Sequence, residues 1–147
     1  MSLKDTLTEA MKTAMRERAK FELGVIRMAL SDIKRVEVDE RIVLDDTRIL
    51  QILDKMTKQR RDAASQFTAG ARQDLADIEL AEVEILKRFL PQPLSETEID
   101  VLIQSAMAET GAAGPQDMGK VMAYVKPQAQ GRADMQVISQ RVKAALA

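Results

Sequence analysis

Two neighbouring segments of the chain repeat apolar residues at alternating spacings of three and four. The first segment carries Ile49, Leu53, Met56, Arg60, Ala63 and Phe67. The second carries Leu75, Ile78, Glu82, Ile85 and Phe89. This spacing gathers each set on one stripe of an α-helix and predicts two helices packed as an antiparallel hairpin. Because no strand-like alternation competes with helical periodicity anywhere in the chain, the predicted fold class is all-α.

Each seam of this predicted hairpin carries one charged residue where an apolar one is expected. These residues are Arg60 and Glu82, and a turn centred near residue 71 places them level with each other. We therefore predict an interhelical ion pair between Arg60 and Glu82, with Glu79 as a second candidate partner. We interpret the pair as structural, setting the helix register, because a guanidinium makes a neighbouring carboxylate a poorer general acid.

Two more helices are predicted before the hairpin. Apolar residues recur every four positions over residues 3–15, and they follow the i, i+3, i+4, i+7 pattern over residues 26–33. Residues 36–44 break this period with β-branched and charged side chains, so we interpret them as a connector.

Capping and breaking residues predict where the two hairpin helices begin and end. Asp45 or Asp46 can accept the unpaired N–H groups at the start of the first one, and Gly70 is suited to a left-handed cap at its end. The second helix is predicted from about residue 72 to residue 89, stopping before the prolines of residues 90–93. A first domain of residues 1–92 with four helices follows from these signals.

Residues 93–147 are predicted to form a second domain of three short helices. Residues 95–98 read Ser-Glu-Thr-Glu, a capping box that starts the first helix. A cluster of glycine, alanine and proline at residues 110–115 ends it. We expect the second helix to close at Pro127 and Asp134 to cap the third.

The composition argues against self-contained catalysis. The chain has no His, Cys or Trp, which removes the commonest general base, the best nucleophile and every zinc-thiolate site. None of its six glycines forms a phosphate-binding loop. We therefore predict no catalytic residue, no metal and no cofactor. No run reaches the roughly 18 apolar residues of a membrane span, and the N-terminus has no apolar signal core, so we expect a cytoplasmic protein without a membrane partner.

The charge is balanced overall, at a formal −1, but it is uneven along the chain. Residues 113–147 hold two acidic side chains, Asp117 and Asp134, against five basic ones: Lys120, Lys126, Arg132, Arg141 and Lys143. One interpretation is an ordinary solvated surface. The other is a small phosphate-binding face, which requires these charges to share one side of the domain. With three Phe and one Tyr the chain cannot build a base-stacking platform, so any RNA would be bound through its shape and phosphates.

Two motifs resemble those of the GatB/YqeY family of bacterial proteins. Residues 117–134 contain D-x-G-x-V-M, a following proline and then G-R-A-D, as in the tail domain of that family. Residues 58–62 read KQRRD, which is similar to the motif of the YqeY N-terminal helical domain. The resemblance covers nearly the whole chain. Met135 departs from the pattern, since the tail often has glycine there.

The resemblance implies a four-helix N-terminal domain followed by a three-helix tail. In tRNA-dependent amidotransferases the related tail of the B subunit helps to grip tRNA, while a separate domain, which nothing here resembles, carries the ATP-dependent chemistry. The resemblance also implies RNA-binding candidates. Together with their basic neighbours these are Gly119, Lys120, Lys126, Gly131, Arg132, Arg141 and Lys143. The two glycines could equally serve tight helix packing.

Three hypotheses for function remain open at this point. The first is a non-catalytic accessory module that binds tRNA or structured RNA through the basic residues of the tail. The second is a helical adaptor that docks on a translation-related protein through apolar anchors. The third is a component of a carbon–nitrogen ligase that uses glutamine as amido-N-donor, and the composition argues against it.

Overall fold

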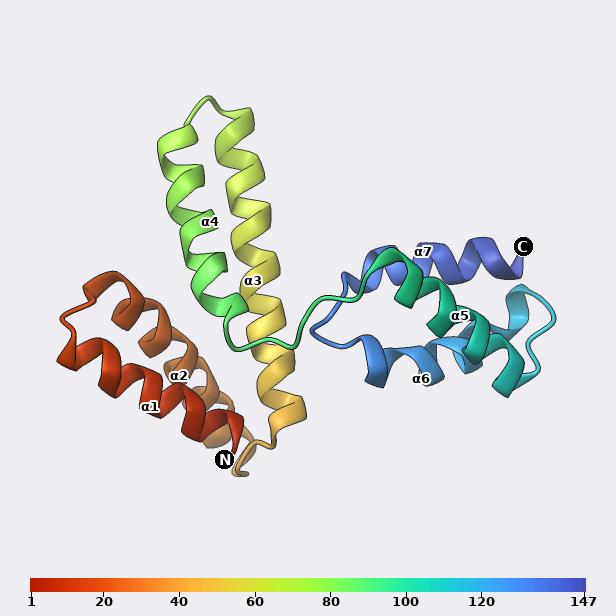
Figure 1. The fold of residues 1–147 in the computed structure, drawn as a ribbon, viewed down its shortest axis with the longest axis horizontal. Helices are drawn as coiled ribbons and strands as arrows, with labels where there is room; N and C mark the ends of the chain where they lie inside the picture. The colour runs from red at the N-terminus through yellow and green to blue at the C-terminus, as the bar shows by residue number, and fades with distance from the viewer. The chain divides into compact units, whose positions relative to one another are not determined.

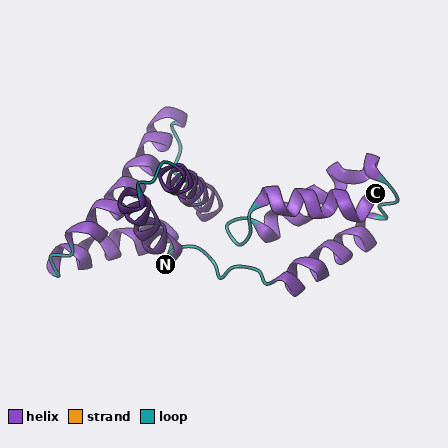
Figure 2. Ribbon diagram, turned by 90° about the horizontal axis from the view of Figure 1, so that it is seen from above, coloured by secondary structure: helices purple, strands orange, loops and turns teal.

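The computed structural model describes residues 1–147, and every regular element in it is a helix (Figures 1 and 2). Seven α-helices and one short 3-10 helix are present, with no strand. This confirms the all-α class predicted from the apolar periodicity. The chain separates into two compact units, Met1–Leu90 and Pro91–Ala147. No helix is both long and apolar enough to cross a membrane.

The first unit consists of two helical hairpins. Its helices are α1 (Leu3–Arg16), α2 (Lys20–Glu40), α3 (Asp46–Ala69) and α4 (Gln73–Lys87). The hydrophobic core joins α1 and α2 to the lower half of the α3–α4 hairpin, through residues such as Leu7, Ile33, Leu53 and Leu86, all at most 1% exposed. The tip of the α3–α4 hairpin projects beyond this core (Figure 1).

The start of α3 resolves the alternative between the two aspartates. Asp45 is the cap, since its Oδ1 accepts a 2.9 Å hydrogen bond from the N–H of Arg48. Asp46 instead accepts the N–H of Leu3, also at 2.9 Å, and so ties the start of α1 to α3. Both carboxylates therefore satisfy helix N-termini, but of different helices.

Residues 36–40 correct the prediction of a connector over residues 36–44, because α2 continues to Glu40. Val36 packs against the core, and the carboxylate of Glu37 receives the Lys4 ammonium at 2.8 Å and the Leu44 N–H at 2.9 Å. These tertiary contacts outweigh the weak helix preference of the β-branched residues. The residue that follows the helix, Arg41, caps it in the left-handed conformation with φ 56°.

The turn between α3 and α4 corrects a second prediction. The helix ends at Ala69 with Gly70 as its cap, but Gly70 has φ −87° and is not left-handed. The left-handed residue is Ala71, with φ 61°. Its neighbour Arg72 then donates its N–H to the carbonyl of Phe67 at 2.8 Å, which closes the turn.

The second unit packs three helices around one small core. Its elements are α5 (Glu96–Thr110), the 3-10 helix η1 (Pro115–Asp117), α6 (Met118–Ala129) and α7 (Met135–Leu146). The core joins all three α-helices, and its largest fully buried side chains are Val121, Val125, Ile138 and Val142. Asp134 caps α7 by accepting the N–H of Gln136 at 2.9 Å.

Pro127 does not end α6, which corrects another prediction. The helix runs two residues further, to Ala129, and its cap donates the Gln130 N–H to the carbonyl of Lys126 at 3.0 Å. A proline this close to the end removes only one intrahelical hydrogen bond, so the last turn persists. The chain then turns at Gly131, which is left-handed with φ 73°.

Candidate nucleic-acid interface

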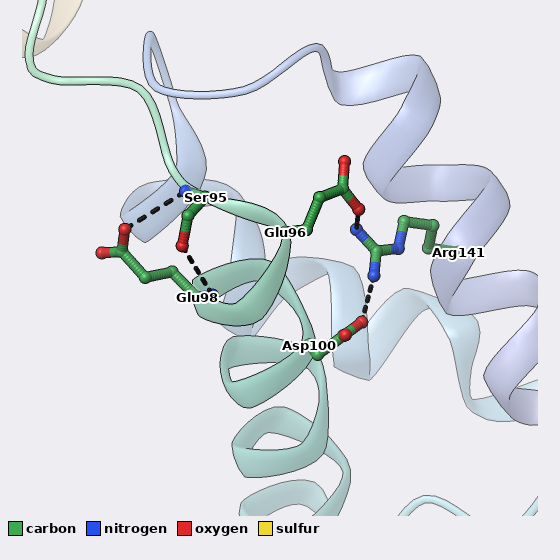
Figure 3. A network of polar contacts seen from close by, with 5 residues as sticks. All are labelled: Ser95, Glu96, Glu98, Asp100 and Arg141. Atoms are coloured by element: carbon green, nitrogen blue, oxygen red, sulfur yellow. Dashed lines mark hydrogen bonds and ion pairs between the residues drawn. The ribbon is translucent and has the colours of Figure 1, made fainter.

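Arg141 connects α7 to the first turn of α5 (Figure 3). Its Nη1 lies 2.8 Å from Oε2 of Glu96, and its Nη2 bonds the carboxylate of Asp100. The two carboxylates come from successive turns of α5, so one planar guanidinium reaches both. Arg141 is thus engaged in holding two helices of the second unit together, and its charge is matched by two acids.

Arg132 is likewise engaged, in this case with the segment that leads into α5. Its Nε donates to the carbonyl of Gln92 at 2.9 Å, and its Nη2 lies 3.7 Å from Oε2 of Glu98. Its own carbonyl accepts the N–H of Leu94 at 2.8 Å. These three contacts fasten residues 92–98 to the turn between α6 and α7.

Glu98 shows the electrostatic consequence of this arrangement. Ser95 and Glu98 form a reciprocal capping box, with both hydrogen bonds at 3.1 Å (Figure 3). The Ser95 N–H, helped by the Ser95 hydroxyl and by the charge of Arg132, lowers the pKa of Glu98. The carboxylate is therefore held in its charged form, as a cap and not as a proton donor.

The three lysines of the second unit are less engaged than the arginines. Lys126 and Lys143 are exposed and form no ion pair. Lys120 is 70% exposed, and its ammonium lies 3.9 Å from Oδ1 of Asp117, at the limit of an ion pair. These three ammonium groups are the cations of the second unit that an external phosphate can reach without breaking a close internal pair.

The candidate cations do not share one face. At about 100° per residue, Lys120 and Lys126 point about 120° apart around α6. Arg141 and Lys143 point about 160° apart around α7, so Lys143 is turned away from α5. The unit as a whole holds five basic and six acidic side chains, because α5 contributes four of the acids. The basic tail predicted from residues 113–147 is therefore a set of separate lysines.

The two candidate glycines differ in their surroundings. A Cβ added to Gly119, an exposed residue at the start of α6, would meet nothing within 4 Å, so close packing does not require glycine there. Gly131 is buried and left-handed, a conformation that other residues adopt only with strain. The turn thus accounts for Gly131, whereas no packing contact accounts for Gly119.

The first unit holds the pair of charged residues from the hairpin seams. Nε of Arg60 lies 3.0 Å from Oε2 of Glu82, and their side chains are 9% and 18% exposed. Arg60 also donates to the carbonyl of Met56 at 3.2 Å and approaches the sulfur of Met28 at 3.9 Å. Glu79 makes no ion pair with it. Each nitrogen of the guanidinium thus has a partner within the unit.

The acidic side chains of neither unit are gathered into a metal-binding cluster. No group of three or more His, Cys, Asp or Glu residues is placed to hold a metal ion. Hydrogen bonds lower the pKa of Glu37, Asp74 and Glu98, and the carboxylate of Asp74 raises that of Arg72. Every one of these shifts favours the charged form, so hydrogen bonding holds these four groups charged.

One cationic feature went unnoticed in the sequence. Lys20, Arg27 and Lys34 are exposed along α2, with Lys20 at the groove between α2 and α4. The signal that could have revealed them is their spacing of seven residues, which repeats every two helical turns. It was obscured because the helix as a whole carries more acids than bases.

Comparisons with known proteins confirm the YqeY-like part of the resemblance. A family model described as "Yqey-like protein" matches residues 4–146. Two curated relatives bear the name "Altered inheritance of mitochondria protein 41, mitochondrial". The protein of Meyerozyma guilliermondii is 32% identical over 124 residues, covering 82% of this chain and 65% of the relative. The protein of Lachancea thermotolerans is 33% identical over 112 residues, covering 74% and 60%. The chain thus spans less than two thirds of the length of these relatives.

The names of these relatives contradict the cytoplasmic location predicted from the N-terminus. They point to mitochondria, and the same name is borne by a relative from Pyrenophora tritici-repentis, 27% identical over 136 residues. The prediction was wrong because an apolar signal core is a mark of secretion only. Its absence does not separate the cytosol from an organelle, whose targeting segments are amphipathic. All three relatives are fungal, so they lend no support to a bacterial source.

Proposed function

The chain belongs to the YqeY-like protein family, and from this premise we propose that it is a non-catalytic accessory protein that binds tRNA or structured RNA. In this proposal residues 1–92 are the N-terminal helical domain of the family. Residues 93–147 are a tail domain related to that of the B subunit of tRNA-dependent amidotransferases. Because the cations of the tail do not form the single phosphate-binding face that the sequence suggested, Lys120, Lys126 and Lys143 would contact RNA phosphates separately, while Arg132 and Arg141 hold the tail together.

The observation that carries this proposal is that the two arginines of the tail are paired with acids, whereas its lysines are exposed. Arg132 and Arg141 meet three of the four acids of α5, so these three are occupied and repel an approaching phosphate less. Lys126 and Lys143 keep their ammonium groups exposed and unpaired. Exposed lysines bind phosphate as mobile point charges, which suits contact with a backbone of any sequence.

The contacts of the tail with RNA should be few and sensitive to salt. Three phosphate contacts predict a loss of roughly 1.5 log units of affinity between 50 and 200 mM salt. Tyr124, the single tyrosine, packs against the core of the second unit and is not free to stack on a base. The proposed binding is therefore to shape and charge, with little preference for sequence.

The test is binding of bulk tRNA to the full chain by fluorescence anisotropy at 50 and 200 mM salt. The variant Lys126→Glu/Lys143→Glu should bind at least tenfold more weakly and with a shallower salt dependence. Arg132 and Arg141 are unsuitable for this test, because reversing their charge would disturb the tail itself. Absence of binding by the unmodified protein at tens of micromolar would overturn the proposal.

A second candidate function is that of a helical adaptor for a translation-related protein. It is favoured by large apolar side chains exposed on the first unit: Phe21 and Met28 on α2, each 46% exposed, and Ile78 on α4, 50% exposed. Phe21 also lines a groove of about 480 Å³ between α2 and α4. Binding through such anchors would be nearly independent of salt, which distinguishes it from RNA binding.

A role as a component of a carbon–nitrogen ligase using glutamine as amido-N-donor has the least support. It would need an activated carboxylate, thiol or metal within the chain or in a partner, and the perturbed carboxylates here are all held charged. Turnover of ATP or glutamine by the purified protein would be its direct test.

A further inference from the structure

The exposed side of α2 carries a straight row of positive charges. Lys20, Arg27 and Lys34 are spaced by seven residues, so they lie on one line along the helix, about 10 Å apart. We propose that this row binds the phosphate backbone of a double-helical RNA. The inference rests on the proposed function, to which it adds a second RNA-contacting surface on the first unit.

None of the three side chains in the row forms an ion pair within the unit. Three acids of α2 are occupied by cations from outside the helix. These pairs are Glu22 with Arg88 at 3.2 Å, Glu37 with Lys4 at 2.8 Å and Glu40 with Arg48 at 2.7 Å. The row therefore stays positively charged and accessible although α2 as a whole has a slight excess of acids.

A shallow groove of about 580 Å³ runs along the same face and gives the charges a surface for a ligand. Arg27, Ser31 and Lys34 line it, and Ser31 lies between the two cations along the helix. Arginine binds phosphate through paired N–H groups, and a serine hydroxyl can donate to a phosphate oxygen. Arg35 also lines the groove, 3.7 Å from Asp32. The single acid in the lining is Asp39, at one end and to the side of the row.

The chemistry of the groove favours a nucleic-acid backbone over a membrane. A helix that binds an anionic bilayer needs a broad face of bulky apolar residues to insert, whereas the large apolar side chains that α2 exposes are Phe21, Met28 and Val38, spread along the helix. On the row itself the exposed apolar residue is Val38. The groove has no aromatic lining for unpaired bases, which favours a duplex over a single strand.

The test compares three full-chain variants in binding to a labelled 24-base-pair RNA duplex and to bulk tRNA, across a salt series. The variant Arg27→Glu/Lys34→Glu removes the row. The variant Lys126→Glu/Lys143→Glu removes the tail lysines. Lys12→Glu/Arg16→Glu, on the exposed side of α1, changes the net charge of the same unit by the same amount and is the matched control. Circular dichroism verifies that each variant is folded.

We expect the row variant to bind duplex RNA at least tenfold more weakly, with a salt slope reduced by about two, whereas the control changes affinity less than threefold. A row variant that binds both RNAs as the control does, while the tail variant is weakened, would overturn the row and leave the proposed function standing. No RNA binding by the unmodified protein would overturn both. Row-dependent capture of phosphatidylserine vesicles or polyglutamate, with RNA binding unchanged, would assign the row to another anionic partner and overturn the inference.

Discussion

The two units of this protein place their arginines differently. In Met1–Leu90, Arg60 is 8% exposed and donates hydrogen bonds to the carboxylate of Glu82 and the carbonyl of Met56. In Pro91–Ala147, Arg132 and Arg141 lie nearer the surface and fasten α5 and the segment before it. The first unit thus has one arginine pair inside, besides exposed pairs such as Arg48 with Glu40, and leaves cations free on α2, whereas the arginine pairs of the second unit all lie nearer the surface.

This difference separates charge that holds a fold from charge that can meet a partner. A buried guanidinium that is already hydrogen-bonded is unavailable to a ligand, and removing its carboxylate partner lowers the stability of the fold. An exposed guanidinium shared between two carboxylates stabilises little and is screened by salt. The cations that remain free to bind a partner are lysines in the tail and the row of Lys20, Arg27 and Lys34 along α2 in the first unit.

The largest effect is expected from a substitution in one of the two separate hydrophobic cores. Leu53 is fully buried in the core of the first unit, and Leu53→Ala should destabilise that unit by about 3 kcal/mol. Residues 91–147 have a core of their own and should keep their protection. Hydrogen exchange followed by mass spectrometry resolves the two units. Equal loss of protection in both would show that they unfold together and would remove the basis for comparing them.

Removing one partner of the buried pair should have the next largest effect. Glu82→Leu leaves the Arg60 guanidinium inside the first unit without its carboxylate, which should cost about 2 kcal/mol after allowing for its partial exposure. The double variant Arg60→Met/Glu82→Leu should regain most of this stability, because no buried charge remains. Urea unfolding gives both values. A double variant less stable than Glu82→Leu would mean that the pair itself stabilises the hairpin.

The features that could be predicted from the sequence are those set within a few residues of each other. Asp45, Ser95 and Asp134 each cap the helix that follows, because the accepting oxygen and the N–H groups are two or three residues apart. The all-α class follows from the same local periodicity. Predicting that Arg60 lies opposite Glu82 in the hairpin needed one further assumption, the position of the turn.

Features set by distant contacts could not be predicted in this way. The end of α2 depends on Lys4, which lies 33 residues from Glu37. The engagement of Arg141 depends on Glu96 and Asp100, more than 40 residues earlier. A count of charges over residues 113–147 therefore described a basic face that α5 largely neutralises. The free row on α2 was hidden for the converse reason, since three acids of the helix are engaged elsewhere.

Loss of an exposed fastener should be much milder than loss of the buried pair. Arg141 is 26% exposed and its partners Glu96 and Asp100 are 87% and 59% exposed, so Arg141→Met should cost less than about 1 kcal/mol. The cost should shrink further in 1 M salt, whereas that of Glu82→Leu should persist. Thermal melts at two salt concentrations provide the comparison. A salt-independent cost near that of Glu82→Leu would erase the distinction between the units.

The smallest expected effect is a difference in acid sensitivity. The Lys4 ammonium and the Leu44 N–H lower the pKa of Glu37 in the first unit, and the Ser95 contacts lower that of Glu98 in the second. Each folded pKa lies below the unfolded value of about 4.3, so each contribution is complete above that pH and is lost as pH falls through the folded value. Glu37→Gln should therefore reduce the loss of stability of the first unit as the pH falls, and Glu98→Gln should do the same for the second unit. Urea midpoints between pH 7 and pH 3, read by hydrogen exchange in each unit, test this. If either substitution reduced this loss equally in both units, the carboxylates would be acting on the whole chain, and the two units would not be electrostatically separate.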